Sequence, residues 1–259
     1  MYRFFVEPEA CKGETIRISG SDRNHMKNVL RLRIGEQVTV SDGTDREYIC
    51  EIQEYDSSEA IVKIVDILGC SAELPTEITL YQGLPKAEKL ELIIQKAVEL
   101  GAVRIVPVIT KRSVVKLDEK KAAKRVERYN TIARSAAKQS KRSRIPVVDR
   151  IMNFTEALED AKGLDMNLIP YEEAKGIEYS RMVLRQVSGK KSLGIFIGPE
   201  GGFEQQEVEA AKAMGAECIT LGHRILRTET AGIALLSILM FSLEQDDRNP
   251  EKRSSGQKD

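Results

Sequence analysis

The spacing of apolar residues changes near residue 72 and divides the chain into two regions. In the first region, apolar and polar residues alternate over short runs, which is the period of a half-buried β-strand. These runs cover residues 15–18, 37–40, 46–52 and 60–65. One helical segment interrupts them, with Met26 in its apolar stripe and Ser21 or Asp22 as its N-cap. Several short strands and one helix predict a small β-barrel over residues 1–72.

The second region, residues 73–246, alternates short apolar runs with longer amphipathic segments. The apolar runs predict strands at residues 78–82, 104–109, 147–148, 166–169, 193–197 and 218–221. The amphipathic segments predict helices at residues 87–100, 119–139, 154–161, 177–187, 204–214 and 228–243. This alternation predicts an α/β fold whose mostly parallel sheet is covered on both faces. The polar segment that follows, residues 247–259, is predicted to be disordered.

Two glycine-bearing loops near the C-terminal end carry the strongest functional signal. The sequence GPEGGF spans residues 198–203 and follows the predicted strand 193–197. The sequence LGHRILRTETA spans residues 221–231 and begins where the predicted strand 218–221 ends. In open α/β sheets, ligands bind beyond the carboxyl ends of strands, and glycine lets the backbone approach them closely. The two loops are therefore predicted to wall one small-molecule site.

Two absent motifs narrow the kind of ligand. The loops do not match the GxGxxG dinucleotide fingerprint, and the chain has no GxxxxGK phosphate loop. What remains is a cofactor held by the backbone groups and apolar walls of several loops at the sheet edge. The residues that suit this role are Gly198, Gly201, Gly202, Leu221, Gly222, Ile225 and Leu226.

Charge is balanced over the whole chain but not along it. Forty basic and forty acidic residues give a net charge of zero, yet residues 111–150 hold fourteen basic and four acidic residues, a local charge of +10. So basic a block predicts a polyanionic partner. The alternative is a solvated helix face that has no partner.

The remaining composition argues against metal-binding and membrane proteins. The four cysteines form no CxxC pair and there are only two histidines, which predicts reduced cysteines and no metal site. The most apolar segment, residues 231–243, is too short to span a bilayer, and residues 1–8 lack the apolar region of a signal peptide. We therefore expect a cytoplasmic protein with no membrane partner.

Further segments form a recognisable set with the glycine loops. They are Arg3-Phe4-Phe5, the stretch from His25 to Arg31, Lys111-Arg112-Ser113, and RSAAKQS at residues 134–140 followed by Arg142 and Pro146. Together these segments resemble the SPOUT class of S-adenosylmethionine-dependent RNA methyltransferases. Within that class the chain is similar, over nearly its whole length, to the 16S ribosomal RNA uridine N-3 methyltransferase (RsmE-like) family. The pairing of GPEGGF with LGxRILRTETA is specific, and His223 occupies the variable position.

The resemblance implies a fold and an activity. The last loops and the last helix would form a trefoil knot, and the first region would be the PUA-like RNA-binding barrel of the family. The enzyme would be a homodimer in which the partner completes each active site. It would use S-adenosylmethionine to methylate ring N-3 of a uridine in 16S ribosomal RNA, at a 1498-type site, either as free RNA or in the assembled small subunit. Ribose 2′-O methylation and non-catalytic RNA binding are the alternatives.

The resemblance also assigns roles to single residues. Arg227, Glu229 and Arg142 are the candidate catalytic residues. Arg227 would grip the RNA or the uracil, Glu229 would order the loop, and Arg142 would act directly at the site by reaching across the dimer. The alternatives are a structural ion pair for Arg227 and Glu229, and bulk RNA attraction for Arg142. Thr228 is expected to be an N-cap, and Glu200 is either an acid near the start of the next helix or a site residue.

Two further groups complete the predicted site. The additional cofactor-binding residues are Leu168, Pro170, Pro199, Glu200, Thr230 and Ala231. The predicted RNA-binding residues are Arg3, Arg23, Arg31, Arg112, Arg134, Lys138, Gln139, Lys141 and Arg144.

Overall fold

The structure, a computed structural model, describes residues 1–11, 13–44, 46–68, 72–86, 89–113, 119–172 and 174–244. The chain forms two compact units. The first consists of Met1–Glu73 and Ala137–Ile145, and the second of Leu74–Ala136 and Pro146–Asp259. Residues 137–145, which the sequence pattern placed in the second region, thus pack with the N-terminal unit. The segment 247–259, predicted to be disordered, lies outside the described residues.

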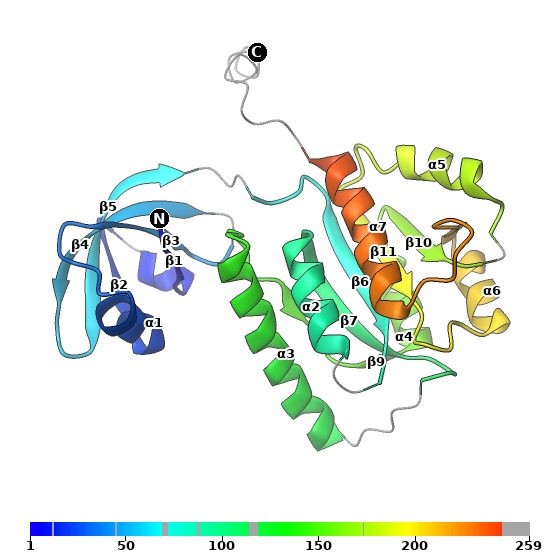
Figure 1. The fold of residues 1–259 in the computed structure, drawn as a ribbon, viewed down its shortest axis with the longest axis horizontal. Coiled ribbons are helices and arrows are strands. Elements are labelled where there is room, and N and C mark those ends of the chain that lie inside the picture. The colour runs from blue at the N-terminus through cyan, green and yellow to red at the C-terminus, as the bar shows by residue number, and fades with distance from the viewer. Residues whose placement is uncertain are drawn as a thin grey trace, which may run out of the picture. The chain divides into compact units, whose positions relative to one another are not determined.

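The first unit is built on one five-stranded sheet (Figure 1). Its strands are β1 (Arg3–Phe5), β2 (Thr15–Ser19), β3 (Gln37–Ser41), β4 (Glu47–Tyr55) and β5 (Glu59–Leu68), in the order β1-β3-β4-β5-β2. Neighbouring strands are antiparallel except β1 and β3. In β2 the alternate residues Ile16 and Ile18 are buried, which is the pattern that predicted the strand, whereas β3 is buried at four consecutive residues. β1 has three residues, too few to show a period, and was not predicted.

Three short helical segments complete the first unit: η1 (Pro8–Cys11), α1 (Gly20–Asn24) and η2 (His25–Val29). The predicted N-cap of this helical region is wrong. Ser19 is the N-cap of α1 and makes no side-chain bond, whereas Ser21 and Asp22 lie inside the helix. Met26 is buried, as its place in the predicted apolar stripe requires.

Buried polar contacts fasten residues 137–145 to the rest of the first unit. Arg142 is 2% exposed, and its guanidinium pairs with the carboxylate of Glu73. The same carboxylate accepts the main-chain N–H of Ser143 at 3.0 Å, and the Ser143 hydroxyl donates to Glu47 of β4. A charge left without its partner in such a place is strongly unfavourable, so these groups depend on one another.

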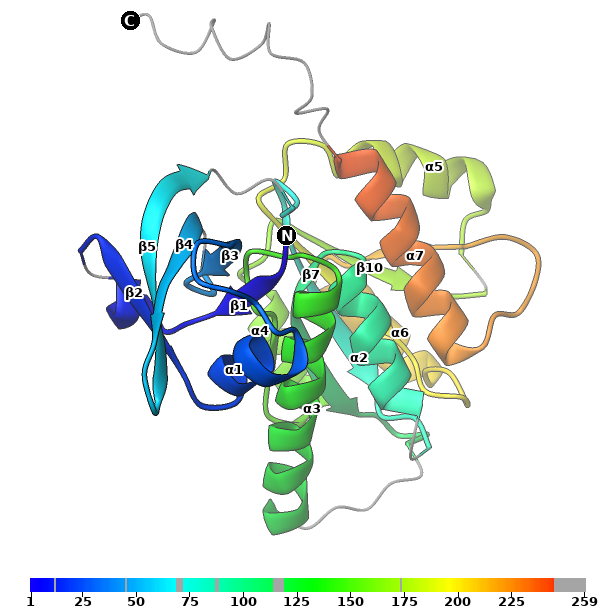
Figure 2. The same cartoon turned by 60° about the vertical axis from the view of Figure 1, so that its left-hand side comes forward.

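The second unit is a parallel sheet with helices on both faces (Figures 1 and 2). Its strands are β6 (Glu77–Gly83), β7 (Ala102–Ile109), β8 (Val147–Val148), β9 (Met152–Asn153), β10 (Met166–Pro170), β11 (Ser192–Ile197) and β12 (Glu217–Ile219). Their order is β12-β10-β11-β6-β7-β8, with β9 also beside β7, and the described pairings are parallel. The predicted α/β fold with a mostly parallel sheet is confirmed.

The helices of the second unit are α2 (Lys89–Glu99), α3 (Glu119–Gln139), α4 (Phe154–Ala161), α5 (Ile177–Arg185), α6 (Gln205–Ala213) and α7 (Thr228–Leu243). α2 and α7 pack side by side in both views. α4 and α6 share a core cluster with the sheet, in which the rings of Tyr81 and Phe196 stack with centroids 4.5 Å apart. Gln82 and Ile197, the next residues along the same strands, point to the opposite face and lie near Gly232 of α7.

The strand order creates a crevice at the carboxyl ends of β6 and β11. These two strands are neighbours, but the chain leaves β6 toward β7 and leaves β11 toward β12, on opposite sides of the sheet. Such a switch point is where open α/β sheets bind ligands. The first glycine loop follows β11 and the second follows β12, so both lie at the edge that the topology selects.

The described residues contain neither a membrane-spanning helix nor a cluster of metal ligands. No helix among them is long and apolar enough to cross a membrane. No group of three or more His, Cys, Asp or Glu side chains in the same part of the chain is arranged to hold a metal ion.

Candidate active site

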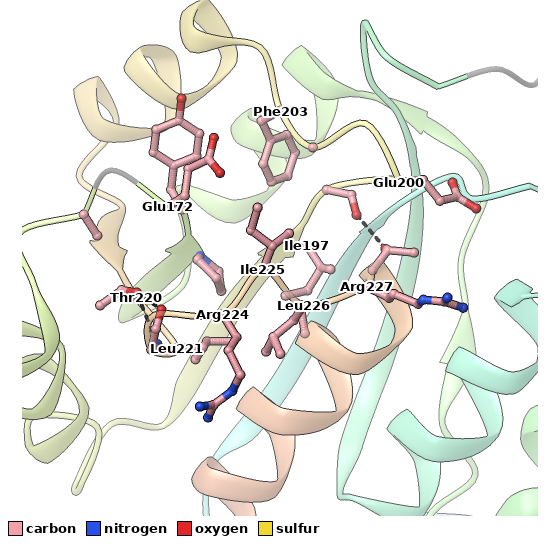
Figure 3. A pocket seen from close by; sticks show the side chains of 18 of the residues that line it. Glu172, Ile197, Glu200, Phe203, Thr220, Leu221, Arg224, Ile225, Leu226 and Arg227 are labelled. Atoms are coloured by element: carbon pink, nitrogen blue, oxygen red, sulfur yellow. Dashed lines mark hydrogen bonds between the residues drawn. The ribbon is translucent and has the colours of Figure 1, made fainter.

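Loops at the carboxyl edge of the parallel sheet enclose a cavity of about 870 Å³ (Figure 3). It is lined by residues between 170 and 177 after β10, by residues 197–203 at and after β11, and by residues 220–228 after β12. Lys89 and Arg112 line it from the segments that follow β6 and β7. A cavity of this size suits a small-molecule ligand or cofactor.

The walls of the cavity differ in character (Figure 3). Ile197 and Leu226 lie at its centre, with Leu221 on one side and the charged Glu200 and Arg227 on the other. An apolar wall with a few convergent polar groups is the usual composition of a binding site for a cofactor. The cavity therefore offers separate places for an apolar ring and for charged groups.

The first glycine loop is a tight turn that rests on the neighbouring strand. The main-chain N–H of Gly202 donates to the carbonyl oxygen of Pro199 at 2.9 Å and closes the turn. Gly202 has a φ of +67°, a conformation that favours glycine. At the end of β6, Gly83 lies so close that an added Cβ would sit 2.6 Å from Pro199. Glycine is therefore needed at both positions for the loop to keep this place.

Thr228 joins the first loop to the helix that follows the second loop. Its hydroxyl donates to the carbonyl oxygen of Gly198 at 2.6 Å and accepts a hydrogen bond from Nε2 of Gln82 at 2.9 Å. The N-cap of α7 is Arg227, and Thr228 is the first residue of the helix, so the predicted capping role of Thr228 is wrong. Its hydroxyl instead links the two loops that line the cavity.

The second glycine loop is anchored at its start and exposed at its tip. The main-chain N–H of Thr220 donates to Oγ of Ser180 in α5 at 2.8 Å. Gly222 has a φ of +121°, which again favours glycine. Ile225 lines the cavity although its side chain is 89% exposed. A large apolar side chain in water at the rim of a cavity is available for contact with a ligand.

A cavity-lining lysine that the sequence analysis missed bridges two acids, one from the first glycine loop and one from α7. Nζ of Lys89 lies 3.3 Å from Oε1 of Glu200 and 3.4 Å from Oε2 of Glu229. Partial burial alone would raise the pKa of Glu200, but main-chain N–H donors and Lys89 outweigh it and hold that pKa below its usual value. Lys89 lies beyond the end of β6, so the rule that ligands bind at switch points could have found it.

The positions of Glu200, Glu229 and Arg227 bear on the alternatives raised by the sequence, and their roles at the site stay predictions. Glu200 lines the cavity and is not the N-cap of α6, which is Glu204. Glu229 forms its ion pair with Lys89. Arg227 is an exposed residue that lines the cavity.

Eleven residues predicted to bind the cofactor line the cavity: Pro170, Gly198, Pro199, Glu200, Gly201, Gly202, Leu221, Gly222, Ile225, Leu226 and Ala231. The other two do not line it: Leu168 is buried within β10, and Thr230 is an exposed residue of α7. Tyr171 and Glu172 line the cavity after β10 and were not predicted.

Arg142 is not among the residues that line the cavity. Its guanidinium is buried in the first unit in the ion pair with Glu73. The structure thus gives Arg142 a structural contact within its own chain. A direct role of Arg142 at the site of a partner chain stays a prediction.

Three of the residues predicted to bind RNA have polar partners within the first unit. Arg3 pairs with Glu47 at 2.6 Å, and Lys138 pairs with Asp22 at 2.6 Å. Arg23 donates to a main-chain carbonyl oxygen at 2.5 Å. A side chain with such a partner must give it up, or share it, before it binds a phosphate.

The other residues predicted to bind RNA lie at the cavity or at least partly at the surface. Arg112 lines the cavity and donates to the carbonyl oxygen of Gly201 at 2.8 Å. Arg31, Arg134, Gln139, Lys141 and Arg144 are exposed or partly exposed.

Comparison with known proteins identifies relatives of the whole chain. An RNA methyltransferase domain model matches residues 72–240, and an RNA methyltransferase PUA domain model matches residues 18–65. The chain is 36% identical over 250 residues to ribosomal RNA small subunit methyltransferase E of Bacillus subtilis, a match that covers 94% of this chain and 98% of the relative. The protein of the same name from Mycobacterium bovis is 30% identical over 90% of this chain and 88% of its own.

A solved relative shows a similar structure. The crystal structure of ribosomal RNA small subunit methyltransferase E from Neisseria gonorrhoeae, bound to S-adenosyl methionine, has a TM-score of 0.80 and is 32% identical, covering 93% of this chain and 97% of that one. The chain combines a parallel α/β unit, which has a cavity built from loops, with a PUA domain. These features and the two matching domain models identify the class of the protein as an RNA methyltransferase. The chain belongs to the ribosomal RNA small subunit methyltransferase E family. The resemblance inferred from the sequence is confirmed.

Proposed function

We propose that the protein methylates ring N-3 of a uridine in the 16S ribosomal RNA of the small subunit, at a 1498-type site. It is an S-adenosylmethionine-dependent ribosomal RNA methyltransferase, and its cofactor is assigned to the cavity between the glycine loops. One observation carries the proposal: both loops that mark the family line a single cavity at the switch point of the sheet.

The residues of the cavity fit S-adenosylmethionine. Ile197, Leu221 and Leu226 offer an apolar wall for an adenine ring. At Gly202 and Gly222 nothing lies within 4 Å of an added Cβ, which leaves the main chain open for contact with a ligand. When bound, the cofactor supplies a methyl group that its sulfonium already activates, so correct positioning should account for much of the rate.

Transfer to N-3 requires that the uracil lose the proton on this nitrogen, which places negative charge on the ring. Arg227 lines the cavity, and we assign its guanidinium to stabilise this charge. Lys89 is held between Glu200 and Glu229, so its charge is already balanced by these acids. Water is the proposed acceptor of the N-3 proton.

We also propose that the protein is a homodimer and that α7 takes part in its interface. Leu235, Leu236 and Leu239 of this helix are buried, but Ile238 and Phe241 are 41% and 83% exposed. A helix that is apolar on all sides requires burial on more than one side. The family resemblance supports the dimer, and it also supports the trefoil knot that we propose for the glycine loops and α7.

Replacing Phe241 with Asp is expected to convert the dimer into a monomer at micromolar concentration. The substitution would bury a carboxylate in an apolar interface, where a charge without a partner is strongly unfavourable. Sedimentation velocity measures the change. Val65→Asp, at an exposed apolar residue of β5, is the control and should leave the dimer intact. A stable monomer formed by the unmodified protein would contradict the proposal.

Neutralising two exposed lysines should weaken RNA binding and its dependence on salt. Lys124 of α3 and Lys141 just beyond the helix are exposed. The variant Lys124→Gln/Lys141→Gln should lose roughly 0.7 to 0.9 from the slope of log affinity against log salt for each phosphate contact removed. Filter binding at several salt concentrations measures the slope. Lys162→Gln, at an exposed lysine that ends α4 outside the basic segment 111–150, is the control. An equal change in that variant would contradict a specific role for the basic segment.

Transfer of a labelled methyl group tests the proposed function as a whole. Purified protein and labelled S-adenosylmethionine are given either small subunits that lack the modification or free 16S RNA. We expect label in the 16S RNA, and the better acceptor identifies the form of the substrate. Cofactor binding without transfer to either acceptor would contradict the proposed activity.

A further inference from the structure

Gln82 is a fully buried amide beneath the candidate active site. It lies next to the last residue of β6, and Nε2 donates to Oγ1 of Thr228 at 2.9 Å and to the carbonyl oxygen of Gly83 at 3.0 Å. Thr228 in turn donates to the carbonyl oxygen of Gly198. One chain of hydrogen bonds therefore joins three segments that are far apart in the sequence: the end of β6, the first glycine loop and the start of α7.

The direction of these bonds follows from the number of protons. The Thr228 hydroxyl has one proton, and the carbonyl oxygen of Gly198 can only accept it. The hydroxyl must then accept from Gln82, and only the amide nitrogen of Gln82 can donate. A Glu at position 82 that carries its charge could not replace it, because a carboxylate has no proton to donate.

The other end of the same amide has no partner. Oε1 of Gln82 is buried and accepts no hydrogen bond from the described residues. A buried carbonyl oxygen without a partner is unfavourable for folding, whereas an apolar side chain of similar size would avoid that cost. Leu80 and Ile195, on the same face of β6 and β11, are fully buried apolar residues. The amide of Gln82 is therefore not explained by the stability of the sheet.

We propose that Gln82 is a positioning residue of the methyltransferase site. Gln82 holds the hydroxyl of Thr228, and this hydroxyl holds the carbonyl group of Gly198. In this way Gln82 fixes the separation of the two glycine loops, which the cofactor requires. Gln82 does not line the cavity, whereas Thr228 and Gly198 do. The inference rests on the proposed function, because it takes S-adenosylmethionine as the ligand of this cavity.

The variant Gln82→Met separates positioning from stability. We expect an unfolding midpoint close to that of the unmodified protein, because removal of the orphaned oxygen offsets the loss of the two hydrogen bonds that Nε2 donates. Calorimetry should show a dissociation constant for S-adenosylmethionine that is larger by roughly tenfold or more, with the same rise in KM for the cofactor. A purely structural role predicts the reverse: a lower midpoint and an unchanged affinity of the folded protein.

Asn167 of β10 provides a matched control. Its Nδ2 donates to a main-chain carbonyl oxygen at 2.9 Å and its buried Oδ1 has no partner among the described residues, but neither atom is bonded to a glycine loop. Asn167→Leu should leave the affinity for the cofactor unchanged. Equal losses in Asn167→Leu and Gln82→Met would show that any buried amide of the sheet matters, and would overturn the proposal.

Substitutions at Thr228 test whether the two residues act in series. Thr228→Ser keeps the hydroxyl and should retain more affinity than Thr228→Val. The double variant Gln82→Met/Thr228→Val should bind no more weakly than Thr228→Val alone, because the second change breaks a chain that is already broken. Additive losses of affinity in the double variant, or unchanged affinity in Gln82→Met, would overturn the positioning role but not the proposed function. Failure of the unmodified protein to bind S-adenosylmethionine would instead contradict the proposed function.

Discussion

Replacing Gly222 with Val is expected to weaken the binding of S-adenosylmethionine at least roughly tenfold, about 1.4 kcal/mol for each factor of ten. Gly222 lines the cavity, and an added Cβ there meets nothing within 4 Å. The new side chain would therefore enter the space assigned to the cofactor. The backbone φ of +121° at Gly222 also disfavours a β-branched residue, so the loop would move from its present path. Calorimetric titration of the folded variant measures the loss.

Gly189→Val separates backbone strain from occlusion of the cavity. Gly189 has a φ of +82° and equally open surroundings, but it does not line the cavity. This variant should be strained in a similar way and still bind the cofactor with normal affinity. Normal affinity in both variants would show that the cofactor does not bind beside the second glycine loop.

Replacing Arg142 with Ala is expected to lower the free energy of unfolding by roughly 3–5 kcal/mol. The substitution leaves the carboxylate of Glu73, whose side chain is 11% exposed, without its guanidinium partner. Domains have only about 5–15 kcal/mol of stability, so the loss should be evident in a denaturant titration. Turnover per folded molecule should change much less than stability does.

The double variant Glu73→Gln/Arg142→Met tests the cause of this loss. It removes both charges but keeps a side-chain oxygen that can accept the main-chain N–H of Ser143, which now donates to Glu73 at 3.0 Å. Most of the lost stability should return, because a buried ion pair can often be replaced by neutral groups at little cost. If Arg142→Ala is instead stable but slow at saturating RNA and cofactor, the direct catalytic role implied by the resemblance holds.

The sequence predicts the second unit well because local periodicity reflects burial. The predicted bounds of α3, α4 and α7 coincide with the observed helices, and each predicted strand of that unit overlaps an observed one. In α2, the predicted stripe that includes Leu90, Ile93 and Ile94 is the buried face. A repeat of 3.6 or 2 residues is a property of a short window of sequence, so it can be read without knowledge of the fold.

The parts of the candidate site that the sequence did not predict depend on contacts between distant residues. Gln82 and Thr228 are 146 residues apart, and Arg142 and Glu73 are 69 apart. Lys89 meets Glu200 because β6 and β11 are neighbours in the sheet, and it meets Glu229 because α2 and α7 pack side by side. Local hydrophobic periodicity does not determine the order of the strands. The partners of a polar side chain, and the buried polar atoms without a partner, are therefore known only from the three-dimensional structure.

The chemical identity of the product tests most directly whether this enzyme methylates N-3 of a uridine, as we propose. Small subunits that lack the modification are incubated with the purified protein and S-adenosylmethionine, and their 16S RNA is digested to nucleosides for mass spectrometry. We predict that 3-methyluridine appears in proportion to enzyme turnover, and that the Gly222→Val variant makes far less of it. A 2′-O-methylated nucleoside, or no methylated nucleoside from subunits treated with cofactor-loaded enzyme, would contradict the account.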